Sequence, residues 1–198
     1  MARTQALDYG EKRNAILQRS AELFAEGGFE RTSMASVAAQ CGVSKPLLYH
    51  YYTNKEELLF DIINGHLEEL CEAIAEADDP SAEPQVRLRA LVGALLDCYR
   101  DANAQHKVQI NALSALPTDK QDLLKAQERK LVAIFAAAVR AINPAIDEKN
   151  SILKPATMSL FGMLNWHYMW FRPEGSISRE DYADLATELF VNGLRGLR

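Results

Sequence analysis

The chain has 198 residues, 48% of them hydrophobic and 25% charged, a composition typical of a soluble globular protein and unlike that of a disordered chain. No apolar run reaches the roughly 18 residues that span a bilayer, and no long apolar segment follows Met1, so we expect a cytoplasmic protein without membrane contact. The net charge of −5, taken alone, argues against a nucleic-acid partner, because phosphate binding depends on Lys and Arg.

An all-α fold of about nine helices is predicted, because apolar residues recur at helical spacing and the period-two runs typical of strands are absent. The first helix is expected to end at Gly27–Gly28, where glycine can adopt the left-handed conformation that caps a helix. One face of this helix is apolar and consists of Ile16, Leu17, Ala21 and Phe24.

Two short helices follow, separated by a glycine turn. The second helix is predicted to begin after the N-cap Ser33 and to break at Gly42. The third is predicted from Lys45 to about Tyr51, after the N-cap Ser44, with a proline tolerated in its first turn. Two short helices joined by a tight turn are the parts of a helix-turn-helix, whose second helix enters a DNA groove.

Six more helices are predicted. The fourth, about Lys55–Ala77, is long enough to connect two domains. The eighth, about Lys149–Phe171, is apolar on more than one face and should be buried on most sides. The others are a fifth with Leu88, Leu91, Leu95 and Tyr99 in register, a sixth over about Gln105–Ala115, a seventh opened by a capping box of Pro117–Thr118 with Gln121 and closed by Asn143–Pro144, and a last helix capped by Ser178 and Asp181.

The residues of the helix-turn-helix narrow the prediction further. They read TSMASVAAQCGVSKPLLYHYY from Thr32 to Tyr52, followed by NKEELL from Asn54. This segment resembles the DNA-binding domain of the tetracycline-repressor family over about residues 10–60, and beyond residue 60 the layout of helices is similar. The resemblance implies a helix-turn-helix DNA-binding domain at 1–55 and an effector-binding and dimerisation domain at 56–198.

The resemblance also assigns DNA contacts. Thr32 and Ser33 lie at a predicted helix N-terminus, where backbone N–H groups and hydroxyls can bind a phosphate. Lys55 is expected to hold the DNA backbone, and Tyr52 is interpreted as a core aromatic. The start and outer face of the third helix match the family's DNA-contacting positions, which are Lys45, Pro46, Leu47, Tyr49, His50 and Tyr51.

Three positions depart from the commonest family pattern: Cys41, Pro46 and Leu47 stand where alanine, glycine and threonine are usual. Pro46 and Leu47 have no side-chain donor, although both can contact thymine methyl groups. Recognition of a particular operator sequence then depends more on the neighbouring polar side chains of the third helix, on DNA shape and on the flanking N-terminal residues.

Charge is distributed unevenly, which weakens the argument from net charge. Residues 1–55 contain seven basic and five acidic residues, a balance of +2. The whole chain has 22 basic and 27 acidic residues, so the part from residue 56 onward has a balance of −7. Any DNA contact is therefore expected near the N-terminus.

A dimer is predicted from the last two helices, whose apolar stripes have nothing left inside the chain to cover them. The expected arrangement is a four-helix interface between two copies, as the resemblance also implies. A twofold dimer places two recognition helices about 34–36 Å apart and predicts a pseudo-palindromic operator. The interface residues on the last helix are Tyr182, Leu185, Ala186, Leu189, Phe190, Gly193 and Leu194.

An effector pocket is expected in the C-terminal domain, because an apolar cavity with a few polar groups is how small ligands are held. The segment Trp166–Pro173 is similar to a tail of family members that sense lipid-derived or acyl-coenzyme A effectors. The ligand would release a repressor from DNA by favouring a state whose recognition helices no longer fit successive grooves. The candidates, each of which also fits an ordinary core or interface position, are Tyr99, His106, Gln109, Phe135, Phe161, Met163, Trp166, His167, Tyr168 and Trp170.

Catalysis is not expected, since the chain contains no nucleophile elbow, HExxH pair, phosphate loop or GxGxxG motif. The cysteines Cys41, Cys71 and Cys98 lie too far apart in the sequence for a disulfide framework or a zinc site, and we expect them to be buried. No metal or cofactor is expected for the protein. Two alternatives stay open: a DNA-organising protein that uses the same helix-turn-helix without an effector, and a sensor whose output is a protein partner.

Overall fold

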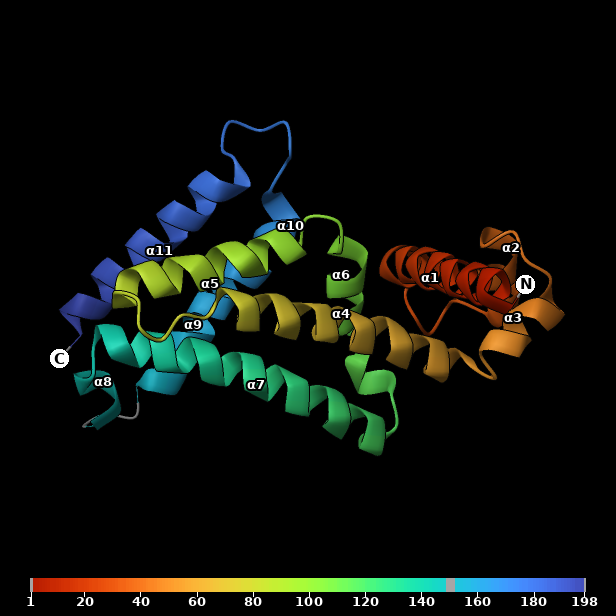
Figure 1. Cartoon of the computed structure of the whole chain (residues 1–198), viewed down its shortest axis with the longest axis horizontal. Coiled ribbons are helices and arrows are strands. Elements are labelled where there is room, and N and C mark those ends of the chain that lie inside the picture. Colours follow the sequence, from red (N-terminus) through yellow and green to blue (C-terminus); the bar gives the residue numbers. More distant parts are fainter. Residues whose placement is uncertain (1, 149–151, 198) are drawn as a thin grey trace. The chain divides into compact units, whose positions relative to one another are not determined.

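The computed structural model describes residues 2–148 and 152–197, with side chains from residue 9 onward except those of residues 147 and 148. This part of the chain contains nine helices of seven or more residues, two single-turn helices and one 3-10 turn, and no strand (Figure 1). The all-α prediction is confirmed. The helices are α1 (Ala2–Gly27), α2 (Met34–Gln40), α3 (Lys45–Tyr51), α4 (Lys55–Ala77), α5 (Pro84–Cys98), α6 (Asn103–Ala112), α7 (Thr118–Ile142), α8 (Ala145–Glu148), α9 (Leu153–Asn165), α10 (His167–Trp170) and α11 (Arg179–Gly196).

Most helix boundaries fall where the capping residues predict them. Ser33 and Ser44 are the N-caps of α2 and α3, and each side chain accepts a hydrogen bond from a backbone N–H of the first turn. Ser178 forms the predicted capping box at the start of α11. Gly28, after α1, has φ 83° and Gly42, between α2 and α3, has φ 65°, both in the left-handed region that glycine tolerates.

The predicted capping box of α7 is wrong. The helix begins at Thr118 as expected, but the Gln121 side chain reaches back to other groups: its Nε2 donates to the carbonyl of Leu116 at 2.8 Å and to that of Ser114 at 3.2 Å. A 3-10 turn over Leu113–Ala115 precedes the helix and leaves these carbonyls without helical partners, so the glutamine satisfies them.

The predicted eighth helix is also corrected. It is two helices, α9 and α10, with Trp166 between them, and residues 149–151 lie outside the described residues. Trp166, Met169 and Trp170 are exposed, so burial on most sides is wrong for the second half. The break turns His167 inward against Phe171, at a ring separation of 4.2 Å, and leaves its bulky neighbours outside.

The chain forms two compact units, neither of which ends at residue 55, and the predicted division into a DNA-binding and an effector-binding domain stays a prediction. Unit 1 contains the chain up to Leu67 together with Ala102–Lys125, because α6 packs along α1. An ion pair of 2.6 Å between Arg13 on α1 and Asp61 on α4 also lies within it. The helix-turn-helix therefore shares a compact unit with α6 and the first half of α4.

Unit 2 contains Glu68–Asp101 and the chain from Ala126 onward. Here α11 packs along α5 and also contacts α9. Arg87 at the start of α5 donates two hydrogen bonds, of 2.6 and 3.0 Å, to the carboxylate of Asp78, which follows α4. The core of this unit is apolar and includes Leu91, Leu95, Phe135, Leu160 and Ala186.

The three cysteines are half-buried, so their predicted burial is wrong. Cys71 illustrates the reason, since it flanks the α4 face whose apolar residues Leu70 and Ile74 are buried. Among the described residues, no helix combines the length and the apolar character needed to cross a bilayer.

Candidate nucleic-acid interface

The α2–turn–α3 segment is held together by a small apolar core. Val37, Ala38 and Leu48 are fully or almost fully buried, and Leu48 is the buried residue of α3. The turn is closed by the Val43 N–H, which donates to the Ala38 carbonyl at 3.0 Å. With Leu48 facing inward, the remaining face of α3 is fixed outward.

The exposed face of α3 carries the predicted DNA-contacting residues. Lys45, Pro46, Leu47 and His50 are exposed, and the Tyr49 side chain is 49% exposed, which excludes a core role for it. Tyr52, in contrast, is buried, as predicted. The structure therefore gathers five of the predicted residues on one accessible helix surface.

Tyr51, the sixth predicted DNA-contacting residue of α3, is neither fully exposed nor buried, and the sequence did not predict the contact that holds it. Its ring is half-buried and stacks on that of Tyr9 from α1, with centroids 4.6 Å apart, while the His50 ring meets it edge-on at 5.9 Å. Tyr9 therefore supports the Tyr51 ring from α1, and Tyr9 is itself exposed. Nothing in the local sequence signals this contact, because it joins positions 42 residues apart.

Two of the predicted phosphate-binding residues are engaged in internal hydrogen bonds. The Thr32 hydroxyl is buried and donates to the Gly28 carbonyl at 2.9 Å. The Lys55 ammonium lies 4.2 Å from the centroid of the Phe29 ring and donates to the carbonyls of Phe29, at 2.9 Å, and Glu30, at 3.4 Å. An ammonium has three N–H donors, so one of those on Lys55 remains for another acceptor. Ser33 is exposed at the N-terminus of α2.

The electrostatics of this segment favour an anionic partner. From Arg31 to Lys55 the sequence contains three basic residues and no acidic residue, within a chain whose net charge is −5. The exposed face of α3 lies in the middle of this segment. A polyanion that approached this segment would meet three cations and no carboxylate side chain of the segment itself.

The candidate effector residues divide between the two units. His106 and Gln109 belong to unit 1, whereas the other eight belong to unit 2. His106 is buried, with its ring centroid 5.9 Å from that of His66 on α4, and burial lowers the pKa of His66 to about 3. The structure thus does not bring the ten candidates together in one unit.

Within unit 2, the candidates Tyr99, Phe135 and Phe161 are buried. The Tyr99 hydroxyl donates to the Asn165 side-chain oxygen at 2.9 Å. Phe135 and Phe161 are buried and pack with ring centroids 4.9 Å apart. Met163 and Tyr168 are half-buried.

Of the other unit 2 candidates, His167 and Trp170 belong to an aromatic cluster of α10 and α11, whereas the exposed Trp166 meets the ring of Tyr168 at 6.4 Å. The His167 ring stacks on that of Tyr182 at 5.1 Å, the Trp170 ring meets Tyr182 edge-on at 4.9 Å, and burial lowers the pKa of His167 to about 4. The Tyr182 hydroxyl donates to the carbonyl of Met163 at 3.1 Å. These contacts hold α10 against the rest of unit 2, and an effector contact of these residues stays a prediction.

The predicted dimer stripe of α11 also divides in two. Tyr182, Ala186 and Leu194 are buried within the single chain, because they face the other helices of unit 2. Leu185, Leu189 and Gly193 are exposed, at a spacing of four residues, with Phe190 half-buried beside them. On α9, the exposed residues Met158 and Gly162 and the adjoining Trp166 repeat the same spacing. We call these exposed residues of α9 and α11 the paired apolar stripes.

Two family models match the chain. One, described as bacterial regulatory proteins of the tetR family, covers residues 16–62, and one described as a tetracyclin repressor-like C-terminal domain covers residues 81–194. The first match contains the whole α2–turn–α3 segment, and the second contains the paired apolar stripes.

Named relatives and solved structures agree with these matches. The chain is 32% identical over 95 residues to the HTH-type transcriptional activator FasR of Mycolicibacterium smegmatis. The matched segment makes up 48% of this chain and 43% of FasR, so the chain spans less than half of that relative. A crystal structure of a TetR-family transcriptional regulator from Bordetella parapertussis is 33% identical, with a TM-score of 0.87 over 94% of this chain and 97% of that one. The structure of AibR in complex with isovaleryl coenzyme A and operator DNA is 28% identical, with a TM-score of 0.78 over 90% of this chain and 97% of that one.

Proposed function

Because the chain belongs to the tetracycline-repressor family of bacterial regulatory proteins, we propose that it is a ligand-responsive transcriptional regulator that binds operator DNA as a homodimer. Each copy places α3 in a major groove, and the pair reads a pseudo-palindromic operator. A small apolar effector releases the protein from DNA, which makes it a repressor.

The observation that carries the proposal is the exposed face of α3. Lys45, Tyr49 and His50 stand outward from a helix fixed by the buried Leu48, in a segment without acidic residues. Lysine binds phosphate or guanine, and the tyrosine ring can contact base edges and thymine methyl groups. In a protein that did not bind nucleic acid, these exposed side chains of α3 would have no role.

Replacing Lys45 by alanine is expected to weaken binding to the operator about tenfold and to lower the slope of log affinity against log salt by about 1, because one cation no longer displaces counterions. Tyr49→Ala is expected to weaken operator binding by a similar factor with little change in the salt slope. Binding of the purified protein to fragments of its own upstream intergenic DNA, at two salt concentrations, measures both effects.

Lys130→Ala is the matched control, because Lys130 is exposed on α7 in unit 2 and the substitution removes the same charge. Its affinity and salt slope should equal those of the unsubstituted protein. Binding that is weak, indifferent to sequence and unchanged by Lys45→Ala and Tyr49→Ala would overturn the assignment of α3 as the recognition helix.

Tyr9 offers a second test of the same surface. We expect Tyr9→Ala to weaken operator binding up to tenfold, because an aromatic pair contributes about 0.5–1.5 kcal/mol and its loss frees the Tyr51 ring. Tyr9→Phe keeps the stacked ring and should bind like the unsubstituted protein. Fluorescence anisotropy with a labelled operator duplex distinguishes the two, and equal affinities for both variants would remove Tyr9 from the interface.

The effector is proposed to bind in unit 2, beside the Tyr99–Asn165 pair and the Phe135 and Phe161 rings. An apolar interior with one polar pair suits a ligand that has an apolar body and a single polar group. The ligand class is proposed as lipid-derived or acyl-coenzyme A, supported by the similarity to AibR, whose structure contains isovaleryl coenzyme A. Release of operator DNA by short acyl-coenzyme A thioesters, measured in the same anisotropy assay, tests this part.

A further inference from the structure

A cavity of about 540 Å³ lies within unit 1, between the end of α1 with its following loop and one face of α6. This volume is in the range of small-molecule sites. The cavity contains none of the effector candidates and none of the predicted DNA-contacting residues.

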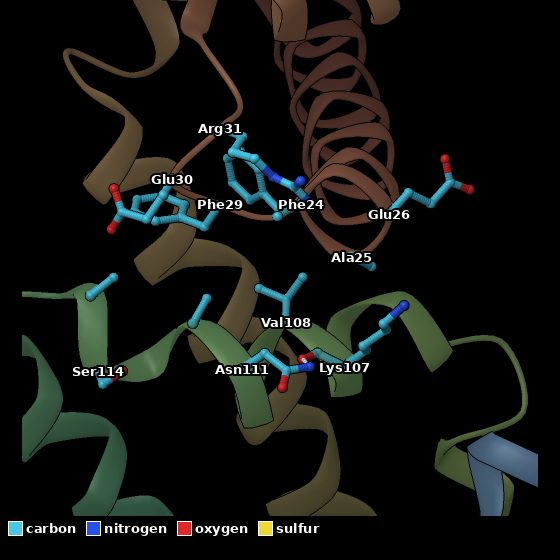
Figure 2. A pocket seen from close by; sticks show the side chains of 13 residues that line it. Phe24, Ala25, Glu26, Phe29, Glu30, Arg31, Lys107, Val108, Asn111 and Ser114 are labelled. Atoms are coloured by element: carbon cyan, nitrogen blue, oxygen red, sulfur yellow. Dashed lines mark hydrogen bonds between the residues drawn. The ribbon is translucent and has the colours of Figure 1, made fainter.

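The walls of this α1–α6 cavity are mainly apolar. Phe24 and Phe29 contribute one wall, with ring centroids 5.2 Å apart in an edge-to-face arrangement, and Val108 of α6 faces them (Figure 2). Ala112 of α6 also lines the cavity. The backbone of Phe29 is fixed from outside the cavity, because its carbonyl accepts a hydrogen bond from Lys55 at 2.9 Å. A ligand would meet a preformed apolar surface rather than a loose loop.

Two cations from opposite sides complete the cavity. Arg31 extends from the α1–α2 loop and Lys107 from α6, as Figure 2 shows. The Arg31 Nε donates to the Gly27 carbonyl at 2.8 Å, which holds the guanidinium over the backbone of Gly28 and leaves its two Nη groups for other acceptors. Within residues 9–146 and 152–197, neither cation forms an ion pair with a carboxylate.

The carboxylates of the cavity do not neutralise these cations. In Figure 2 the side chains of Glu26 and Glu30 point outward on opposite flanks, away from Arg31 and Lys107. The side-chain NH2 group of Asn111 donates to the Lys107 carbonyl at 2.9 Å, which orders the α6 wall. The cavity thus has apolar walls and two cations that are not ion-paired within the described part of the chain, while its two carboxylates point away from them.

We propose that the α1–α6 cavity binds a small amphipathic organic anion, whose charged group pairs with Arg31 and Lys107 and whose apolar body lies against Phe24, Phe29 and Val108. This site is separate from the effector pocket proposed in unit 2 and does not depend on DNA binding. Its ligand contacts Arg31, two residues before the N-cap of α2, so an occupied cavity would stiffen the entry to the helix-turn-helix.

Octanoate and its neutral analogue octanamide are the probes, followed by NMR of the full chain with carbon-13 in alanine and valine methyl groups. We expect octanoate to shift the methyl signals of Val108, Ala112 and Ala115, and octanamide to bind at least about tenfold more weakly, since it lacks the charge. Arg31→Gln and Lys107→Gln should each weaken octanoate binding about five- to tenfold. Arg19→Gln is the control: it removes an exposed cation of α1 outside the cavity and should leave octanoate binding unchanged.

Ala115→Leu provides a second variant that keeps both charges and fills the cavity, and it should abolish the octanoate shifts at Val108. The proposal is overturned if octanoate and octanamide bind equally, or if the shifts at Val108 survive the loss of both cations. It is also overturned if octanoate moves only methyl groups of unit 2, such as those of Val139, which would place the ligand elsewhere.

Discussion

Leu185→Glu combined with Leu189→Glu is expected to convert the proposed dimer to a monomer. The paired apolar stripes are exposed in the single chain, and a charge at their centre would have to be desolvated for two copies to associate. Because two linked half-site contacts reinforce each other, a monomer should lose operator affinity on the order of a hundredfold or more. Sedimentation velocity and operator binding on the same preparation measure both results.

Leu123→Glu is the matched control for this prediction. Leu123 on α7 is 59% exposed, as is Leu189, and it lies outside the paired apolar stripes. The control should stay dimeric with unchanged operator affinity. A double variant of α11 that still sedimented as a dimer would show that the two copies associate through another surface.

Folding stability is expected to fall between pH 7.5 and pH 5 by about 2 kcal/mol through His66 alone. Burial, with a smaller effect of His106, lowers the pKa of His66 from 6.5 to about 3, so in this range the unfolded chain takes up a proton that the folded chain does not. For a depressed histidine pKa the stabilisation is complete above pH 6.5 and is lost as the pH falls toward 3. Urea unfolding at the two pH values measures this loss.

His66→Gln removes the titrating group. The free energy of unfolding of this variant should therefore fall less between pH 7.5 and pH 5 than that of the unsubstituted protein, by about 2 kcal/mol. His50→Gln is the control, because His50 is exposed on α3, and it should keep the original pH dependence. Identical pH dependence of both variants would mean that His66 takes up its proton in the folded protein as readily as in the unfolded chain, as a solvated imidazole or one that donates to a carboxylate does.

The sequence predicted helix boundaries well where the signal is local. The N-caps Ser33 and Ser44, the turn glycine Gly42 and the Ser178 capping box depend on residues within four positions of one another, and all appear where expected. The break at Trp166 is different, because it depends on His167 packing against Tyr182, fifteen residues further along the chain. An apolar periodicity continues through such a break and hides it.

The site could be predicted only in part for the same reason. The outward face of α3 followed from placing Leu48 in the core, and its exposure was predictable. The support of Tyr51 by Tyr9, the internal hydrogen bonds of Lys55 and the packing of α6 on α1 all join distant segments. Spacing along a sequence contains no information on such contacts, so the division of the effector candidates between two units could not be foreseen.

The paired apolar stripes contain a glycine on each helix, Gly162 on α9 and Gly193 on α11, and a Cβ added at either position would meet no atom of its own chain within 4 Å. In a dimer, those two positions would govern how closely the helices of the two copies approach. The separation of the two recognition helices, and with it the number of base pairs between operator half-sites, would then be set in part by residues that never touch DNA. Two relatives with the same α3 surface but a larger side chain at position 162 or 193 would read the same half-site at a different spacing.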